Sequence, residues 1–192
     1  MLGVVVGLLC ALSWACGSIL TRDLARKLDP ITLNAPRMLI GGLAMLAVTL
    51  ATGRQAGYAL LTPERLLFLM GSMVVGGGLG GLALVLGGIY LVGRPSEDPL
   101  AVLPASTRTS GVSMALLASL CWAGSMVLVA PGIEGLDTIM VASVRTPAMA
   151  LVLWGVVAAR RTWPQLAALS RREWLVITVG GLIGWGFGSV LF

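Results

Sequence analysis

The sequence contains an ungapped internal repeat, in which residues 3–80 align with residues 111–188 at a constant offset of 108. About 21 of the 78 aligned pairs are identical. Apolar composition alone would align Leu, Val and Ala by chance, but it would not align rare or charged residues. We therefore interpret the chain as a duplicated unit. The pairs that composition does not explain are Trp14 with Trp122, Asp29 with Asp137, and Arg37 with Arg145.

The composition places both copies in a membrane. Hydrophobic residues make up 57% of the chain and charged residues 11%, and the mean hydropathy is +0.96, which is not typical of a soluble domain. A helix needs about 20 apolar residues to cross the hydrocarbon core of a bilayer. The sequence thus predicts an all-α, polytopic membrane bundle with three spans in each copy. The predicted spans are about 2–20, 31–51, 66–92, 111–129, 138–158 and 174–192.

The residues between the spans set the boundaries of the two repeats. We assign residues 1–92 to the first repeat, 93–110 to a polar linker that contains Pro, and 111–192 to the second repeat. Several spans are preceded by residues that typically cap or begin a helix, including a Ser and Glu at the spacing of a capping box. These residues are Asp29, Pro30, Pro63, Asp137, Ser170 and Glu173.

The basic residues of the loops indicate that the two repeats are inverted. The first connection of repeat one carries three Lys or Arg residues and its counterpart at 130–137 carries none, whereas the second connection carries two and its counterpart four. Opposed insertion of two three-helix units produces this reversal, and the more basic face is expected in the cytoplasm. The residues are Arg22, Arg26 and Lys27, then Arg54 and Arg65 against Arg160, Arg161, Arg171 and Arg172.

Several function classes find no support in the sequence. The chain has no His, and its three cysteines lie inside predicted spans, where a buried thiol is more common than a disulfide or a metal ligand. No nucleophile and base occur in a catalytic pattern, so we expect no enzyme, no metal and no cofactor. The basic residues lie in short loops, which does not indicate nucleic acid as a partner. The cysteines are Cys10, Cys16 and Cys121.

The ordered double occurrence of one motif resembles a known family. The first helix reads Leu-Ser-Trp-Ala-Cys-Gly-Ser over 12–18 and is followed by Asp29-Pro30 and Arg37; the second copy repeats this at 120–125, Asp137 and Arg145. This pattern resembles the EamA branch of the drug/metabolite transporter superfamily. The resemblance implies a multi-pass carrier of metabolites or drugs in the plasma (inner) membrane, of bacterial type, with the lipid bilayer and a small-molecule substrate as partners.

The length of each copy differs from that of the family it resembles. Such transporters resemble two inverted units of five helices, whereas each unit here has three visible spans. We expect the fourth helix and most of the fifth to be missing, with the first gap near Gly80-Gly81. The charge bias places the N-terminus outside, whereas the resemblance implies a cytoplasmic N-terminus.

Five residues are candidates for substrate binding. Arg37 and Arg145 each stand eight residues after a capping Asp, roughly 12 Å into a span, where a charged side chain costs about 2.5–3.5 kcal/mol on insertion scales. Their guanidinium groups would bind a carboxylate or phosphate of the substrate, or would only snorkel and bond to backbone carbonyls. Trp14 and Trp122, mid-span, would stack on a flat substrate or would pack, and Asn34 would bond a ligand or a neighbouring helix.

The sequence therefore predicts an exporter or exchanger of small metabolites or drug-like molecules that works by alternating access between the two repeats. The alternative is a non-transporting membrane scaffold or a truncated, inactive fragment. Glycines at four-residue spacing over 180–188 indicate close helix packing and would also support a homodimer.

Overall fold

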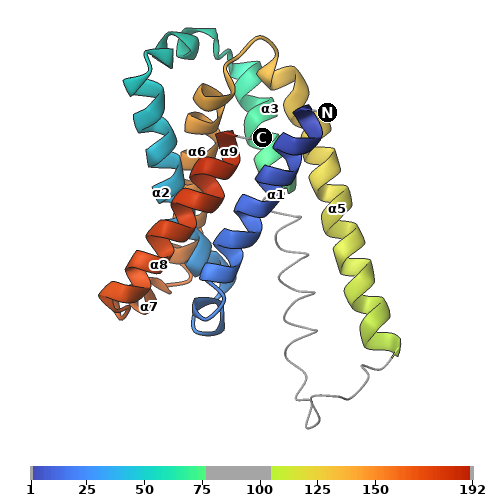
Figure 1. Ribbon diagram of the computed structural model, residues 1–192, viewed down its shortest axis with the longest axis vertical. Coiled ribbons are helices and arrows are strands. Elements are labelled where there is room, and N and C mark those ends of the chain that lie inside the picture. The colour runs from blue at the N-terminus through green and yellow to red at the C-terminus, as the bar shows by residue number, and fades with distance from the viewer. Residues whose placement is uncertain (1, 77–104, 191–192) are drawn as a thin grey trace. The chain divides into compact units, whose positions relative to one another are not determined.

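The computed structural model describes residues 2–76 and 105–190, and every regular element in these two ranges is helical (Figure 1). The all-α prediction is therefore confirmed for this part of the chain. The third predicted span beyond Gly76, the linker up to residue 104 and the Gly80-Gly81 junction lie outside the described residues. The elements are α1 Leu2–Leu20, η1 Leu24–Arg26, α2 Pro30–Ala51, η2 Arg54–Leu60, α3 Pro63–Met73, α5 Ala105–Ile133, α6 Thr138–Ala159, α7 Trp163–Ala167, α8 Arg171–Gly181, η4 Leu182–Phe187 and α9 Gly188–Val190.

Within the described residues, two helices have both the length and the hydropathy of a membrane span. In the described ranges α2 and α6 meet both criteria with 22 residues each. A third span would have to combine two helices, 54–60 and 63–76, that meet at an angle of 105°. The prediction of six spans is therefore confirmed for α2 and α6, and the remaining spans stay a prediction. Helices α1 and α5 are also apolar, over residues 5–20 and 119–133.

Local sequence signals begin the helices where they were predicted. The Asp29 carboxylate accepts hydrogen bonds from the backbone N–H groups of Ile31 and Thr32, at 3.1 and 3.2 Å, and Asp137 caps α6 in the same way. Proline begins α2 and α3, where the missing N–H costs no helical bond. Ser170 and Glu173 form a complete capping box, so α8 begins three residues before the predicted span. Helix α5 begins at Ala105, inside the segment that we predicted to be linker.

The described chain divides into two compact units. Unit 1 comprises residues 1–62 and 135–192, and thus α1, α2, α6, α7 and α8 with its continuation through η4 and α9. Unit 2 comprises residues 63–134, and thus α3 and α5. Each unit takes helices from both predicted repeats. The division into repeats at 1–92 and 111–192 is a statement about sequence and stays a prediction.

Helices α2 and α6 pack against each other along their whole length in unit 1, and they run antiparallel. Thr32, near the start of α2, bonds to Thr162 just beyond the end of α6 at 2.8 Å, and Thr49 near the end of α2 donates to the Ile139 carbonyl at the start of α6. Near the middle a Cβ on Gly42 would lie 2.8 Å from the Pro147 ring. The absence of a side chain at position 42 therefore allows the two backbones to approach closely.

The first helix of unit 1 packs against the last part of the chain. Helix α1 contacts α8, η4 and α9, and the Ser13 hydroxyl donates to the Ile183 carbonyl (Figure 1). The connection between α1 and α2 packs with α2, the short helix α7 and α8 around a small apolar core. Its buried members are Leu24, Leu28, Leu33, Leu166 and Ile177. In unit 2, α3 packs against α5.

Candidate functional site

Arg37 is the central residue of the candidate site, because it is a buried cation in the middle of unit 1. Its side chain is 7% exposed, and one terminal nitrogen donates to the Asn34 side-chain oxygen at 3.1 Å. Its Nε has no hydrogen-bond partner, and no carboxylate pairs with it in the described part of the chain. Asn34 is held in turn by a bond to the Pro30 carbonyl at 3.0 Å. A buried guanidinium with a free N–H can still bind an anion.

Glycines of α1 and α8 surround this guanidinium. A Cβ on Gly17 would lie 3.3 Å from an Arg37 terminal nitrogen and 3.1 Å from the Gly180 carbonyl oxygen. A Cβ on Gly184 would lie 3.6 Å from the same nitrogen, and one on Gly181 would lie 2.7 Å from the Arg37 carbonyl oxygen. The guanidinium thus fills the space that these glycines leave between α1, α2 and α8. The predicted close-packing role of these glycines agrees with this geometry.

Trp14 packs against the end of the chain. Its ring centroid lies 4.6 Å from that of Trp185, with an interplanar angle of 59°. A Cβ on Gly188 would lie 2.7 Å from the Trp14 Nε1 atom. These contacts favour the packing role among the two that the sequence left open.

The two arginines lie on the same helix pair but at different levels. The Gly42 contact with Pro147 sets the register of the antiparallel helices, which places Arg145 beside the region of Ala44. Arg37 is seven residues earlier on α2, or about 10 Å along the helix at 1.5 Å per residue. Each lies within about one turn of the middle of its helix. Arg145 is half-buried, and Trp122 is half-buried on α5 in unit 2.

A reciprocal packing pattern, which sequence reasoning missed, relates the two units. In unit 1 the first helix of repeat one meets the third helix of repeat two, where a Cβ on Gly17 would lie 3.3 Å from Gly184 Cα. In unit 2 the first helix of repeat two meets the third helix of repeat one, where a Cβ on Gly76 would lie 2.6 Å from the Ser125 Oγ. Positions 17 and 125, and 76 and 184, are aligned by the offset of 108. The alignment carried this signal, but only tertiary contacts show which helices meet.

A second missed pattern lies at the two ends of the α2–α6 pair. The Arg160 side chain beyond the end of α6 lies 3.4 Å from the Asp29 carboxylate that caps α2. At the other end, Arg54 beyond the end of α2 pairs with the Asp137 carboxylate that caps α6. Each capping Asp therefore accepts hydrogen bonds from the backbone at the start of its own helix. It also forms an ion pair with an arginine just beyond the end of the neighbouring helix. Such exposed pairs contribute little stability, about 0–1 kcal/mol.

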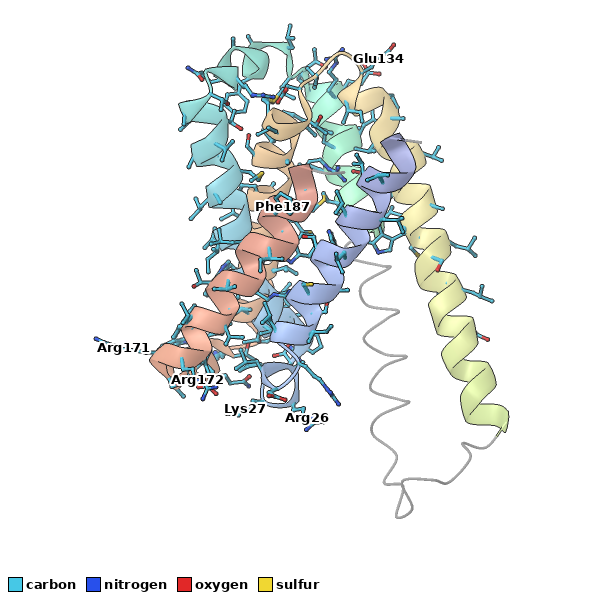
Figure 2. All side chains as sticks on the ribbon, in the orientation of Figure 1. Arg26, Lys27, Glu134, Arg171, Arg172 and Phe187 are labelled. Atoms are coloured by element: carbon cyan, nitrogen blue, oxygen red, sulfur yellow. The ribbon has the colours of Figure 1, made fainter. Side chains whose placement is uncertain are left out.

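One end of unit 1 is strongly basic, as Figure 2 shows for Arg26, Lys27, Arg171 and Arg172. Lys27 lies 2.6 Å from the Glu173 carboxylate. This hydrogen bond, together with those from the Ser170 backbone and hydroxyl, lowers the pKa of Glu173 to about 2. The distribution of basic residues among the loops predicted that these four residues lie on the same face of the membrane. In unit 1 they lie at the same end of the helices (Figure 2).

Comparison with known proteins supports the resemblance seen in the first repeat. Residues 1–93 match the sequence model of the EamA-like transporter family. No curated protein and no solved structure matches the chain. The matched segment contains α1, α2 and α3, and thus Trp14, Asn34 and Arg37. The family consists of integral membrane transporters of small molecules and not of enzymes. Residues 1–93, just under half of the chain, are thus similar to the EamA-like transporter family.

Proposed function

We propose that this chain moves small metabolites or drug-like molecules across a membrane, as an exporter or exchanger, by alternating access between two inverted repeats. The observation that carries the proposal is the reciprocal packing of first and third helices. Gly17 meets Gly184 in unit 1, and the aligned residues Ser125 and Gly76 meet in unit 2. The antiparallel course of the equivalent helices α2 and α6 supports inversion, because related helices of inverted repeats run in opposite directions.

The third helix of each repeat carries a change of helix type that would serve as a joint. The α-helical bonding of α3 ends at Met73 and residues 74–76 are π-helical. The α-helical bonding of α8 ends at Gly181, the aligned position, and π-helical segment η4 follows. Short π-helical segments occur frequently at functional sites, and they weaken the regular hydrogen-bond ladder. Bending at these aligned positions would open and close access to the substrate.

Arg37 is the proposed anchor for an anionic group of the substrate. It is a buried cation with no carboxylate partner in the described residues, and its Nε donor is unused. In the described conformation the guanidinium packs among glycines of α1 and α8. Separation of these helices during the transport cycle would expose it to a carboxylate or phosphate. Trp14, Asn34, Trp122 and Arg145 remain proposed contributors.

The test is efflux from proteoliposomes loaded with a defined mixture of carboxylate- and phosphate-bearing metabolites, quantified by mass spectrometry. The native chain should release at least one component saturably. Arg37→Gln should reduce that flux by about tenfold or more, which corresponds to about 1.4 kcal/mol. Arg37→Lys, which keeps the charge but not the planar fork, should retain part of it.

The control variant is Arg54→Gln, which removes an exposed arginine of η2, beyond the end of α2 and 17 residues after Arg37. Its flux should equal that of the native chain. Flux by the native chain that Arg37→Gln leaves unchanged would remove Arg37 from the substrate site. No flux above empty liposomes, together with stable co-purification of another membrane protein, would favour the scaffold alternative.

A further inference from the structure

The basic end of unit 1 carries more positive charge than its own carboxylates neutralise. It comprises the loop between α1 and α2, the end of α6, α7 and the start of α8 (Figure 2). Seven basic residues stand there against three acidic ones. The basic residues are Arg22, Arg26, Lys27, Arg160, Arg161, Arg171 and Arg172, and the acidic residues are Asp23, Asp29 and Glu173.

Two of the three carboxylates at this end already have partners. Asp29 caps α2 and pairs with Arg160, and Glu173 caps α8 and pairs with Lys27. The remaining arginines make no ion pair within the described ranges, and each is exposed. Five guanidinium groups are therefore available to an external anion. They are Arg22, Arg26, Arg161, Arg171 and Arg172.

An exposed indole lies in sequence between Arg160-Arg161 and Arg171-Arg172. Trp163 is the first residue of α7 and is 58% exposed. The same short helix buries Leu166, which is 3% exposed in the apolar core of unit 1. Because Leu166 fixes α7 to the bundle, Trp163 is held on the outside. A Trp placed beside arginines at the end of membrane helices is typical of the interface with lipid headgroups.

The opposite end of the α2–α6 pair lacks this surplus. Its basic residue in unit 1 is Arg54, which is paired with Asp137. Both ends border the membrane, since α2 and α6 have the length and hydropathy to cross it. A difference in charge between two ends of the same spans predicts a difference in the lipids that they contact.

We infer that the basic end of unit 1 binds the phosphate headgroups of anionic phospholipids, with the Trp163 ring placed at the boundary between headgroups and acyl chains. Guanidinium groups form bidentate hydrogen bonds with phosphate oxygens. The five free arginines are exposed and come from two connections and from the start of α8. Arginines distributed over a surface can each contact a different headgroup of a lipid layer. A small soluble anion would instead need several donors that point at one place.

The experiment is native mass spectrometry of the full chain in detergent with equal amounts of phosphatidylglycerol and phosphatidylcholine of the same acyl chains. The native chain should retain phosphatidylglycerol about threefold or more over phosphatidylcholine. In Arg171→Gln/Arg172→Gln that ratio should fall towards one, because two of the five free cations are lost. Trp163→Ala should reduce the total lipid retained without changing the ratio.

Matched controls separate the lipid from other causes. Arg54→Gln should keep the native ratio, and Arg26→Gln provides a single change in another loop should the double variant fail to fold. A native ratio near one would overturn the inference, as would a double variant that keeps the native preference. Inorganic phosphate that displaces phosphatidylglycerol completely at millimolar concentration would indicate a site for a soluble anion and would overturn the assignment to lipid.

Discussion

In both units the first helix of one repeat contacts the third helix of the other at aligned positions, but the side chains at the contact differ. In unit 1 α1 meets α8 and η4 at Gly17, Gly180 and Gly184, and the Arg37 guanidinium from α2 occupies the space that these glycines leave. In unit 2 the positions aligned with these three glycines are Ser125, Ser72 and Gly76. The close approach is thus common to both copies, whereas the side chains that complete it are not.

The two copies therefore share the close approach of the helix backbones but not the side chains at the crossing point. Helix pairs in a membrane gain stability from close packing, so a small residue is needed at the crossing point in either copy. The buried cation needs additional room, and unit 1 provides it with glycine at three positions. We therefore expect substitutions at aligned positions to have unequal effects.

The largest effect should come from Gly41→Ala in unit 1. A Cβ at this position on α2 would lie 2.6 Å from the Trp185 Cβ and 2.9 Å from the Gly181 carbonyl oxygen, so backbone must move. The aligned residue on α6 is Met149, which shows that the second copy has no such restriction at this position. We expect a loss of about 3 kcal/mol in the free energy of unfolding, measured by denaturant titration in detergent micelles.

Gly155→Ala on α6 is the matched control, because a Cβ there meets nothing within 4 Å. It should be neutral or stabilise the chain by up to about 1 kcal/mol, as alanine favours the helix. Equal losses in Gly41→Ala and Gly155→Ala would contradict the close approach of α2 to η4.

A smaller effect should distinguish the aligned glycines of the third helices. Gly76→Ala in unit 2 would place a Cβ 2.6 Å from the Ser125 Oγ and 2.7 Å from its Cβ, and it should cost about 1–2 kcal/mol. Gly184→Ala in unit 1 would meet only an Arg37 nitrogen at an ordinary 3.6 Å and should cost little. The measurement is again the free energy of unfolding of each variant.

The cause of the Gly76→Ala loss can be tested by a second change in the same pair. Ser125→Gly removes the atoms that the new methyl group meets, so Gly76→Ala/Ser125→Gly should be more stable than Gly76→Ala alone. Additive losses in the double variant would show that α3 and α5 do not meet at this pair.

Local features of the fold were predictable from sequence, and tertiary partners were not. The capping roles of Asp29 and Asp137 depend on residues two and three positions away, and both were confirmed. The pairing of Arg54 with Asp137 joins residues 83 positions apart and had no signal in either loop. Apolar runs likewise do not reveal where helical bonding changes, so η4 was missed inside the sixth predicted span.

The candidate site was predictable only as a set of positions. Arg37 stood out because a charge inside an apolar run is costly, and the structure indeed buries it. Which neighbours surround it could not be deduced, since the glycines involved lie on two other helices. Trp14 was also identified, but composition could not choose between a cavity and its contact with Trp185.

The smallest expected effect is a difference in pH dependence between the N-terminal ends of α8 and α3, the third helices of the two repeats. Helix α8 begins with a capping box in which Lys27 and Ser170 lower the pKa of Glu173 to about 2, whereas α3 begins at Pro63 with Arg65 at the position aligned with Glu173. Because the pKa of Glu173 is lower in the folded chain than its ordinary 4.5, ionised Glu173 stabilises the fold above about pH 4.5, and this stabilisation is lost as the pH falls towards 2.

Thermal unfolding of the native chain and of Glu173→Gln across this range would measure that contribution. The native chain should have the higher Tm at pH 6, and the difference should vanish as the pH approaches 2. Lys27→Met removes the strongest cause of the lowered pKa of Glu173, so its loss of Tm on acidification should be smaller than that of the native chain and should be complete at a higher pH. A Tm difference between native and Glu173→Gln that stays constant from pH 6 to pH 2 would show that the capping geometry stabilises α8 without the carboxylate charge, and the starts of α3 and α8 would then differ in shape alone.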